Sequence, residues 1–345
     1  MKLASRLSLA LFALACASAC RNQNTVVVPN RVLDRPLDMT LACVEKSDDR
    51  IVVRALNDCV DQPLGHCLDE DTPQLIGFIA NSEKNEVGMF RRCDTNGMVD
   101  LDPEAPGYNL VPVGTTPSRI VQTPDCRVVT ANYGSCDLSA IEMPDLAAYA
   151  VGLPPDEAPS SLVSTIVPRR SDGTPLGARP GDMIAVPREL SLADDGDVSF
   201  GDTGTDESGG AESSGGDTNT VETDGADGFI GGACDPEASA SVYVTFPQCQ
   251  LVAEISLDTQ RVLQSRQFVL DDNGEITIVD SGPDPVCPIE CPAQFDGDIP
   301  DIAAPPDGGV FPIALALVEG EEGADSHHFE LPSLFVGGSD SDEIF

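Results

Sequence analysis

The sequence has little positive charge, few histidines and no tryptophan. Its 345 residues include 58 Asp and Glu against 19 Lys and Arg, and only three histidines are present. The formal net charge is −39 at pH 7, so the phosphate backbone of a nucleic acid would be repelled. We therefore expect no nucleic-acid partner, and we interpret the surplus of acids as a solubilising surface that would also attract cations.

The motifs of several common enzyme classes are absent. The sequence contains no G-x-S-x-G elbow, no Walker loop, no G-x-G-x-x-G fingerprint and no H-E-x-x-H helix. His327 and His328 are adjacent, and neighbouring side chains of an extended chain point in opposite directions, so a shared metal ion would need a turn. We expect polar loops there and at His66. No catalytic residue is assigned, and a non-enzymatic protein is favoured over an enzyme.

Acidic turns make calcium the one cofactor to consider. Residues 94–100 fail the EF-hand register, because Gly97 stands at position 4 where that loop needs glycine at position 6. The short acidic turns at 194–197 and 296–301 would bind calcium only weakly, and solvated turns are the default expectation. We predict no cofactor and no metal site, with weak calcium binding as the alternative.

The first nineteen residues have the pattern of a bacterial secretory signal. Residues 1–6 carry two positive charges and no acid, residues 7–15 are apolar or small, and small residues follow. The apolar run is too short to cross a bilayer as a helix. No later segment approaches 18 uninterrupted apolar residues, so we expect a cleaved signal peptide at 1–19 and no transmembrane helix.

Two modes of cleavage fit the end of this signal. Ala17-Ser18-Ala19 suits ordinary secretion, which is the alternative reading. The same residues followed by Cys20 resemble the lipobox of bacterial lipoproteins, although that family prefers Leu where this chain has Ala17. The resemblance implies that Cys20 is acylated and anchors the chain through a linker at 20–35. Arg21, in place of the Asp that retains such proteins in the inner membrane, favours the outer membrane.

Ten cysteines follow Cys20, an even number that can pair completely if Cys20 carries the lipid. In an exported chain such cysteines form disulfides, whereas zinc sites use closely paired C-x-x-C units, and none occurs here. The disulfide candidates are Cys43, Cys59, Cys67, Cys93, Cys126, Cys136, Cys234, Cys249, Cys287 and Cys291. The sequence leaves their pairing open.

A weak internal repeat runs along the chain from residue 36. Each copy shows an apolar strand, a polar turn of about five residues and a second strand, and a proline opens another apolar stretch upstream. The strand–turn–strand segments are 76–90, 127–141, 241–255 and 334–345. The prolines are Pro36, Pro117, Pro180 and Pro312. Asn81 and Asn132 recur at matching positions, where we expect strand-end hydrogen bonds that shape the turn.

The clearest copy of the repeat runs from Val113 to Asn132 and reads VGTTPSRIVQTPDCRVVTAN. Together with GFIANSEKNEVGMF and SVYVTFPQCQLVAEISLDTQRVL, it resembles the YVTN-type repeats of bacterial β-propellers. The resemblance implies an all-β domain at 36–345, built as a β-propeller-like array of four-stranded blades. The sequence ends within the last hairpin, which favours an incomplete array over a small ring closed by a strand near 25–28.

Long insertions separate the strands of this array, because the prolines lie farther apart than the roughly 40–50 residues of a blade. The insertions are expected at 44–72, 188–240 and 319–330. Residues 194–228 hold eleven acids, nine glycines and neither Lys nor Arg. Such a composition buries too little apolar surface to offset the entropy of ordering, so this acidic insertion is predicted to be disordered.

The most economical functional hypothesis is a membrane-anchored envelope lipoprotein that acts as a binding or scaffold module. A rigid β scaffold would present the inserted loops, which is where binding residues usually lie. The expected partners are the membrane, through the lipid, and a protein or polysaccharide. Two rivals are a metal-dependent, lactonase-like propeller hydrolase with acids around a cation, and a purely structural envelope protein.

Overall fold

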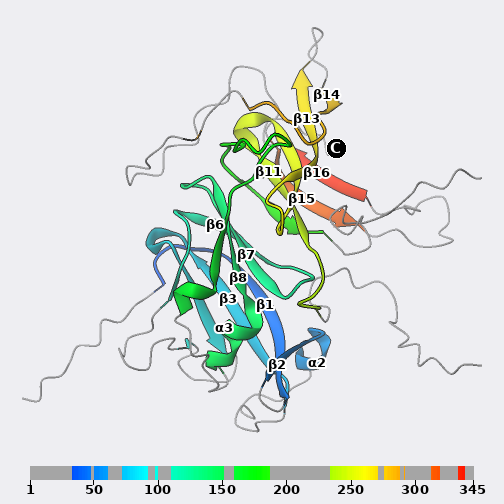
Figure 1. Ribbon diagram of the computed structural model, residues 1–345. Helices are drawn as coiled ribbons and strands as arrows, with labels where there is room; N and C mark the ends of the chain where they lie inside the picture. Colours follow the sequence, from blue (N-terminus) through cyan, green and yellow to red (C-terminus); the bar gives the residue numbers. More distant parts are fainter. Residues whose placement is uncertain are drawn as a thin grey trace, which may run out of the picture.

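A computed structural model describes the protein over residues 33–47, 50–60, 72–91, 98–99, 110–150, 159–186, 234–270, 276–287, 291, 312–318 and 333–338. Regular structure in these residues is almost entirely β (Figure 1). The helices described are α2, Asn57–Val60, and α3, Met143–Ala150, besides short 3₁₀ turns. No helix in these ranges is long and apolar enough to cross a membrane.

The strands form four antiparallel sheets, which we number in chain order. Sheet 1 has the order β2-β1-β3-β4-β5, with β1 Pro36–Ser47, β2 Arg50–Arg54, β3 Gln74–Asn81, β4 Glu86–Arg91 and β5 Val111–Pro112. Sheet 2 has the order β6-β7-β8-β9, with β6 Pro117–Gln122, β7 Arg127–Asn132, β8 Asp137–Glu142 and β9 Val163–Ile166. Sheet 3 has the order β10-β11-β12-β13-β14, with β10 Met183–Ala185, β11 Ser241–Phe246, β12 Leu251–Ser256, β13 Val262–Leu270 and β14 Ile276–Asp280. Sheet 4 pairs β15 Pro312–Val318 with β16 Ser333–Gly338.

The all-β prediction is confirmed, but the expected uniform four-stranded unit is wrong for most of the sheets. Sheet 2 alone has four strands, whereas sheets 1 and 3 have five and sheet 4 has two among the described residues. In sheet 1 the extra strand comes from the segment expected to be a loop insertion. There β1 continues to Ser47, and β2 pairs with its second half from Cys43↔Arg54 to Ser47↔Arg50.

The sheets pack face to face in the order 1, 2, 3, 4. We call the face on the side of the lower-numbered neighbour the back of a sheet, and the opposite face its front. Their first strands, β1, β6, β10 and β15, lie beside one another (Figure 1). One apolar core fills the space between sheets 1 and 2, and a second fills the space between sheets 2 and 3. A smaller cluster around Phe268 and Val336 joins sheets 3 and 4.

Burial on both faces explains why the middle strands read as nearly continuous apolar runs. All but the first residue of β7 are buried, as are all six residues of β12. The hairpins expected at 76–90, 127–141 and 241–255 are present as β3–β4, β7–β8 and β11–β12. Each turns through a left-handed residue at the same place, at Asn85, Cys136 and Gln250, with φ of 57°, 59° and 53°.

Four disulfides join the described parts of the chain. Cys43 of β1 pairs with Cys59 of α2, and Cys249, in the turn between β11 and β12, pairs with Cys287, which follows β14. The other two, Cys126–Cys234 and Cys136–Cys291, link residues separated by 108 and 155 positions in the sequence. Eight of the predicted disulfide candidates are therefore paired, while Cys67 and Cys93 lie outside the described residues.

Candidate functional site

A pocket of about 290 Å³ lies on the front of sheet 3, where β16 crosses it. This volume is at the lower end of the range found for ligand pockets in proteins. Its lining residues are Tyr243, Val252, Glu254, Gln264, Ser265, Arg266, Phe268, Ile278, Leu334 and Val336. They come from β11 to β14 of sheet 3 and from β16 of sheet 4.

The pocket results from the unequal widths of the two sheets. Sheet 4 has two strands in the described part of the chain, and β15 packs against β10 and β11. The outer strands of sheet 3 extend beyond this cover, and four of the five residues of β14 are exposed. Apolar side chains therefore wall the pocket where the cover ends, with Phe268 and Val336 buried and Ile278 about half-exposed.

A hydrogen-bonded group of polar side chains forms one wall of the pocket. Glu254 is completely buried, and its carboxylate accepts hydrogen bonds from Ser241 Oγ at 2.6 Å and Gln264 Nε2 at 2.9 Å. Gln264 Nε2 also donates to Tyr243 Oη at 3.2 Å. A buried charge is tolerated only when it is well hydrogen-bonded, and Glu254 meets this condition.

The environment of Tyr243 keeps its hydroxyl protonated. Burial, and next the negative charge of Glu254, raise the pKa of Tyr243 to about 12. The phenol is therefore a neutral hydrogen-bonding group at physiological pH. At the rim, Arg266 Nη1 lies 2.7 Å from Asp280 Oδ1, and both side chains are largely exposed. The pocket thus combines an apolar wall, a hydrogen-bonded polar wall around Glu254 and a charged rim.

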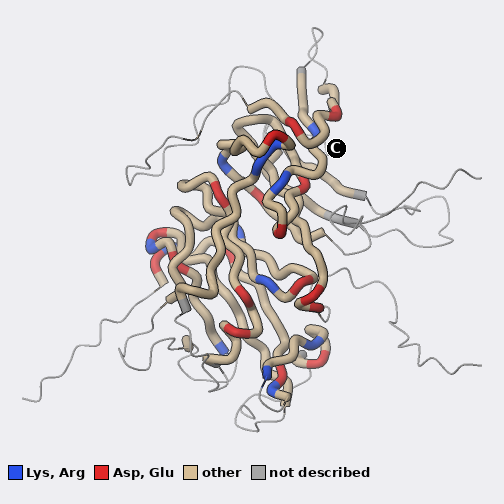
Figure 2. Tube along the Cα trace, viewed as in Figure 1, with Lys and Arg blue, Asp and Glu red and all other residues tan. Residues whose placement is uncertain are grey.

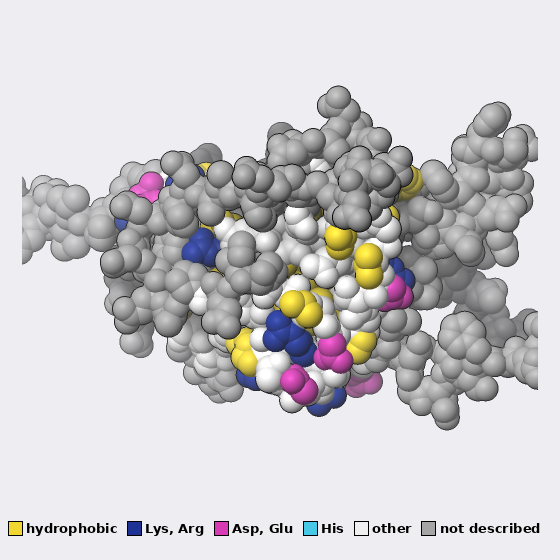
Figure 3. Space-filling view, turned by 90° about the horizontal axis from the view of Figure 1, so that it is seen from above, with side chains coloured by type: hydrophobic (Ala, Val, Ile, Leu, Met, Phe, Trp, Pro, Cys, Tyr) yellow, Lys and Arg dark blue, Asp and Glu magenta, His cyan; other side chains and the backbone are white. Residues whose placement is uncertain are grey.

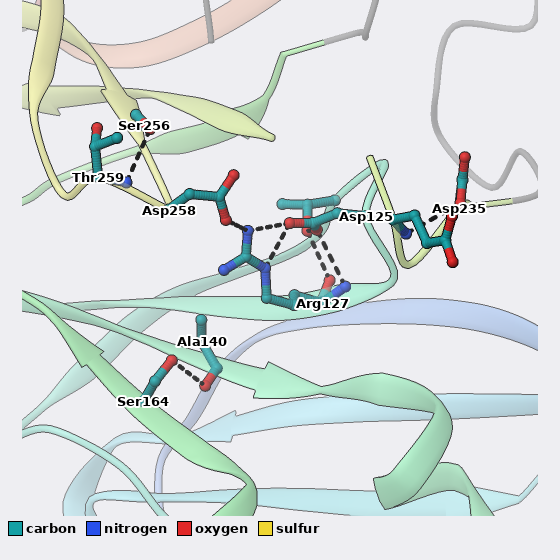
Figure 4. A network of polar contacts seen from close by, with 10 residues as sticks. Asp125, Arg127, Ala140, Ser164, Asp235, Ser256, Asp258 and Thr259 are labelled. Carbon is teal, nitrogen blue, oxygen red and sulfur yellow. Dashed lines mark hydrogen bonds and ion pairs between the residues drawn. The ribbon is translucent and has the colours of Figure 1, made fainter. Parts of the chain in front are cut away.

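A second polar cluster joins sheets 2 and 3 around Arg127 (Figure 4). Its guanidinium pairs with Asp125, which is 3% exposed, and Arg127 Nη2 lies 2.7 Å from Asp258 Oδ1. Burial alone would lower the pKa of Arg127, but the hydrogen bond and charge of Asp125, helped by Asp258, outweigh it and the pKa is raised. We interpret this cluster as a structural link, because the single guanidinium pairs with one carboxylate from sheet 2 and one from sheet 3.

Acidic and basic residues are interspersed along the rest of the described chain. Red and blue residues lie near one another at several places along the trace (Figure 2). The end of the molecule seen from above likewise combines basic, acidic and hydrophobic side chains (Figure 3). In the ranges the structure describes, no group of three or more His, Cys, Asp or Glu side chains has an arrangement that could hold a metal ion.

The two repeated asparagines differ in their roles. Asn132 Nδ2 donates to Asp137 Oδ1 at 2.8 Å and to Ser139 Oγ at 2.9 Å, which confirms the predicted hydrogen bonds at this turn. Asn81 Oδ1 instead accepts from the backbone N–H of Asp34 at 2.7 Å, so it holds the chain just before β1. Neither asparagine lies at the pocket.

Most of the other residues singled out from the sequence lie outside the described residues. These are the lipidation candidate Cys20, the three histidines, the acidic turns at 194–197 and 296–301, and the acidic insertion at 194–228. Only Met98 and Val99 of the 94–100 segment are described. The structure therefore leaves the signal peptide, the lipid anchor and weak calcium binding as predictions.

Sequence reasoning missed the pocket, although one signal was available. Glu254 is the single acid in the apolar strand Leu251–Ser256, and an acid in a run expected to be buried indicates a paired or functional carboxylate. Its partners Tyr243 and Gln264 carry no such signal.

A scan against protein-family models and a search of curated proteins gave no match for this chain.

Proposed function

We propose that this protein is an exported lipoprotein of the cell envelope that acts as a binding module, with the pocket on sheet 3 as its ligand site. The observation that carries the binding role is the combination of an apolar wall with a fully hydrogen-bonded polar wall. Such pockets bind the apolar part of a ligand and orient it through a few polar groups. The ligand class that fits is a small molecule or side chain with an apolar body.

The proposed architecture is an open, propeller-like array of sheets. Support comes from the front-to-back packing of successive sheets and from the contact between their first strands. The repeated left-handed position in three hairpins adds to it. Sheets with five strands depart from the four-stranded blade of the family that the sequence resembles.

Export is supported by the disulfides, because cross-links of this kind persist in oxidising compartments. The anchor is tested by labelling cells with an alkyne-bearing palmitate. We expect label on the wild type and on Cys16→Ala, and none on Cys20→Ala. Undiminished label on Cys20→Ala would contradict the anchor and favour ordinary secretion.

The binding role is tested with the apolar fluorescent probe anilinonaphthalene sulfonate on the folded, oxidised protein. Ile278→Trp fills the pocket from its rim, and Val279→Trp places the same ring on the neighbouring residue, which is similarly exposed and does not line the pocket. We expect roughly tenfold weaker probe binding for Ile278→Trp, which corresponds to about 1.4 kcal/mol, and no change for Val279→Trp. Equal effects of the two variants would count against the pocket as the site.

The hydrolase rival makes a different prediction. A metal-dependent enzyme would carry a stoichiometric ion, which native mass spectrometry of the full chain would detect. A tightly bound divalent ion would contradict the purely binding role.

A further inference from the structure

The back of sheet 1 is an apolar sheet face that no other sheet covers among the described residues. Met39 on β1 and Ile79 on β3 are register partners on this face, and Leu41 pairs with Gly77, over which the ring of Phe90 packs. A Cβ at Gly77 would lie 2.0 Å from Phe90 Cε1, so glycine is needed for this packing. We call Met39, Leu41, Ile79 and Phe90 the back patch.

Equivalent residues in sheets 2 and 3 show what such a face normally does. A proline opens β1 and β6, and Pro180 lies three residues before β10. The third residue after these prolines is Met39, Ile120 and Met183, respectively. Ile120 and Met183 are each 2% exposed because they pack against the preceding sheet, whereas Met39 is 58% exposed. In sheets 2 and 3 the residue at this position therefore contacts the preceding sheet, whereas in sheet 1 it is exposed.

Residues of the hairpins β3–β4, β7–β8 and β11–β12 show the same difference in burial. Ile79 is half-buried, whereas Thr130 and Val244, at the same distance from the left-handed turn residue, are fully buried. Phe90 is likewise half-buried, whereas its equivalents in sheets 2 and 3 are fully buried isoleucines. Leu33, Met98 and Leu110 approach this face near Gly88, and Met98 forms a β-bridge with Phe90 at one edge of the patch. The back patch therefore has the chemistry of an interface with the front of another sheet.

Sheet 4 has a front that no other sheet covers among the described residues. In sheet 4, Leu315 points back toward sheet 3, where it packs against the cluster of Val252, Phe268 and Val336. Ala314 and Ala316 alternate with it and are exposed. Phe335, the register partner of Ala316, lies on the same face and is half-buried. The two alanines beside this ring leave room for the longer Met39 and Ile79 of a facing sheet, as large and small residues alternate across packed layers.

The backbone donors are also compatible with such a contact. Met39 N–H is already satisfied by its own neighbour, Asp38 Oδ1, at 2.9 Å. Met183 N–H is satisfied in the same way by Asp182 Oδ1 at 3.0 Å, and its sheet still packs against sheet 2. A junction onto sheet 1 therefore needs no acceptor from the facing sheet.

We propose that the back patch of sheet 1 is an interface that receives the front of sheet 4 from a second copy of this chain. The contact would continue the front-to-back packing that already joins sheets 1 to 4. It is heterologous, since one copy contributes sheet 1 and the other contributes sheet 4, and such contacts build rings or open chains of copies.

Oligomeric state tests the proposal. The full chain is exported so that its disulfides form, with Cys20→Ala to leave out acyl chains, and its mass is measured by light scattering after gel filtration over a range of concentrations. We expect assemblies of two or more chains that dissociate on dilution. Met39→Asp on one surface and Ala316→Arg on the other should each give single chains, because a charge would be buried without a partner. Val286→Asp, at a residue that is 68% exposed and outside both surfaces, is the control and should assemble like the parent.

Mixing the two variants distinguishes this geometry from others. One Met39→Asp chain retains an intact sheet 4, and one Ala316→Arg chain retains an intact back patch, so an equimolar mixture should form a two-chain species. Circular dichroism and the absence of free thiols confirm that each variant is folded. Leu37→Asp, at a 44% exposed residue two positions before Met39 in β1, is a second variant, placed next to the back patch. A parent that stays a single chain at every concentration would overturn the proposal. So would a mixture that stays single-chain, or Ala316→Arg assembling normally while Met39→Asp does not.

Discussion

The carboxylate of Asp38 accepts a hydrogen bond from the backbone N–H of Ile120, with 3.0 Å between Oδ2 and N, across the junction of sheets 1 and 2. Asp182 repeats this contact with the N–H of Leu315, at 2.9 Å, across the junction of sheets 3 and 4. At the middle junction the corresponding residue is Arg119, whose Nε lies 2.8 Å from Asp182 Oδ1. One position in the repeat, two residues after the proline, therefore joins each sheet to the next.

Removing the acceptor at this position should destabilise the stack. Asp38→Ala leaves the N–H of Ile120, a residue that is 2% exposed, without its partner. We expect a loss of about 1–3 kcal/mol in the free energy of unfolding, as for a buried donor left unsatisfied. Asp38→Asn retains an acceptor oxygen and should lose less. Guanidinium denaturation of the oxidised proteins measures both, and equal stability of wild type and Asp38→Ala would contradict the role of this bond.

Substitutions at Arg127 and at Asp258 should reduce the free energy of unfolding by very different amounts. Arg127→Met leaves the carboxylate of Asp125 buried without its cation, which should cost about 3–5 kcal/mol of stability. Asp258→Ala removes a partner that is 46% exposed, so the expected loss is only about 0–1 kcal/mol. Denaturant midpoints compare the two variants. A larger loss for Asp258→Ala would show that Arg127 and Asp125 are not the buried core of the cluster.

Disulfides with different loop lengths should contribute unequally to stability. Cys126–Cys234 spans 108 positions and Cys43–Cys59 spans 16. In the chain-entropy account the longer loop constrains the unfolded state more, so its removal should cost about 1–2 kcal/mol more. The paired serine variants Cys126→Ser/Cys234→Ser and Cys43→Ser/Cys59→Ser test this by chemical denaturation. Preserved stability after loss of the longer cross-link would contradict the expectation.

Tyr243 should titrate later than an ordinary tyrosine. Its pKa is raised from 10.0 to about 12, so the folded state keeps a proton that the unfolded state loses. The stability that this group contributes is complete below pH 10 and is lost as the pH rises from 10 to about 12. The near-ultraviolet titration of the wild type minus that of Tyr243→Phe isolates the phenol. Glu254→Gln should move its midpoint down, because a negative neighbour is removed; an unchanged midpoint would exclude Glu254 as a cause.

Asp137 gives a pH effect in the acid range. Burial raises its pKa above the ordinary 3.8, against the opposing hydrogen bonds from Asn132 and Ser135. Its contribution to stability is therefore present below that value and is lost as the pH rises through the folded-state pKa. Asp137→Asn retains an acceptor without the charge and should gain stability relative to the wild type between acid and neutral pH. Parallel stability curves for the two proteins would contradict this.

Much of the strand content follows from local pattern. The strands Arg127–Asn132 and Asp137–Glu142 have mainly apolar interiors between polar ends, and they form the expected hairpin. Local pattern did not predict three features of the structure: the pairing of the cysteines, strand β2 of sheet 1, and the polar wall around Glu254. Each depends on residues from separate strands or from distant parts of the chain, such as Cys136 and Cys291, which lie 155 positions apart.

The sequence by itself determined that this chain is built from short β-strands, because alternation and turn residues act over a few neighbours. It also determined which cysteines are available for cross-links and that the net charge is strongly negative. Only the tertiary structure decided which cysteines meet, how many strands each sheet gathers and which faces are covered. Met39 and Ile120 occupy the same place in the repeat, yet they are 58% and 2% exposed. The reason is that burial depends on which sheet packs against a residue, and that sheet is supplied by another part of the chain.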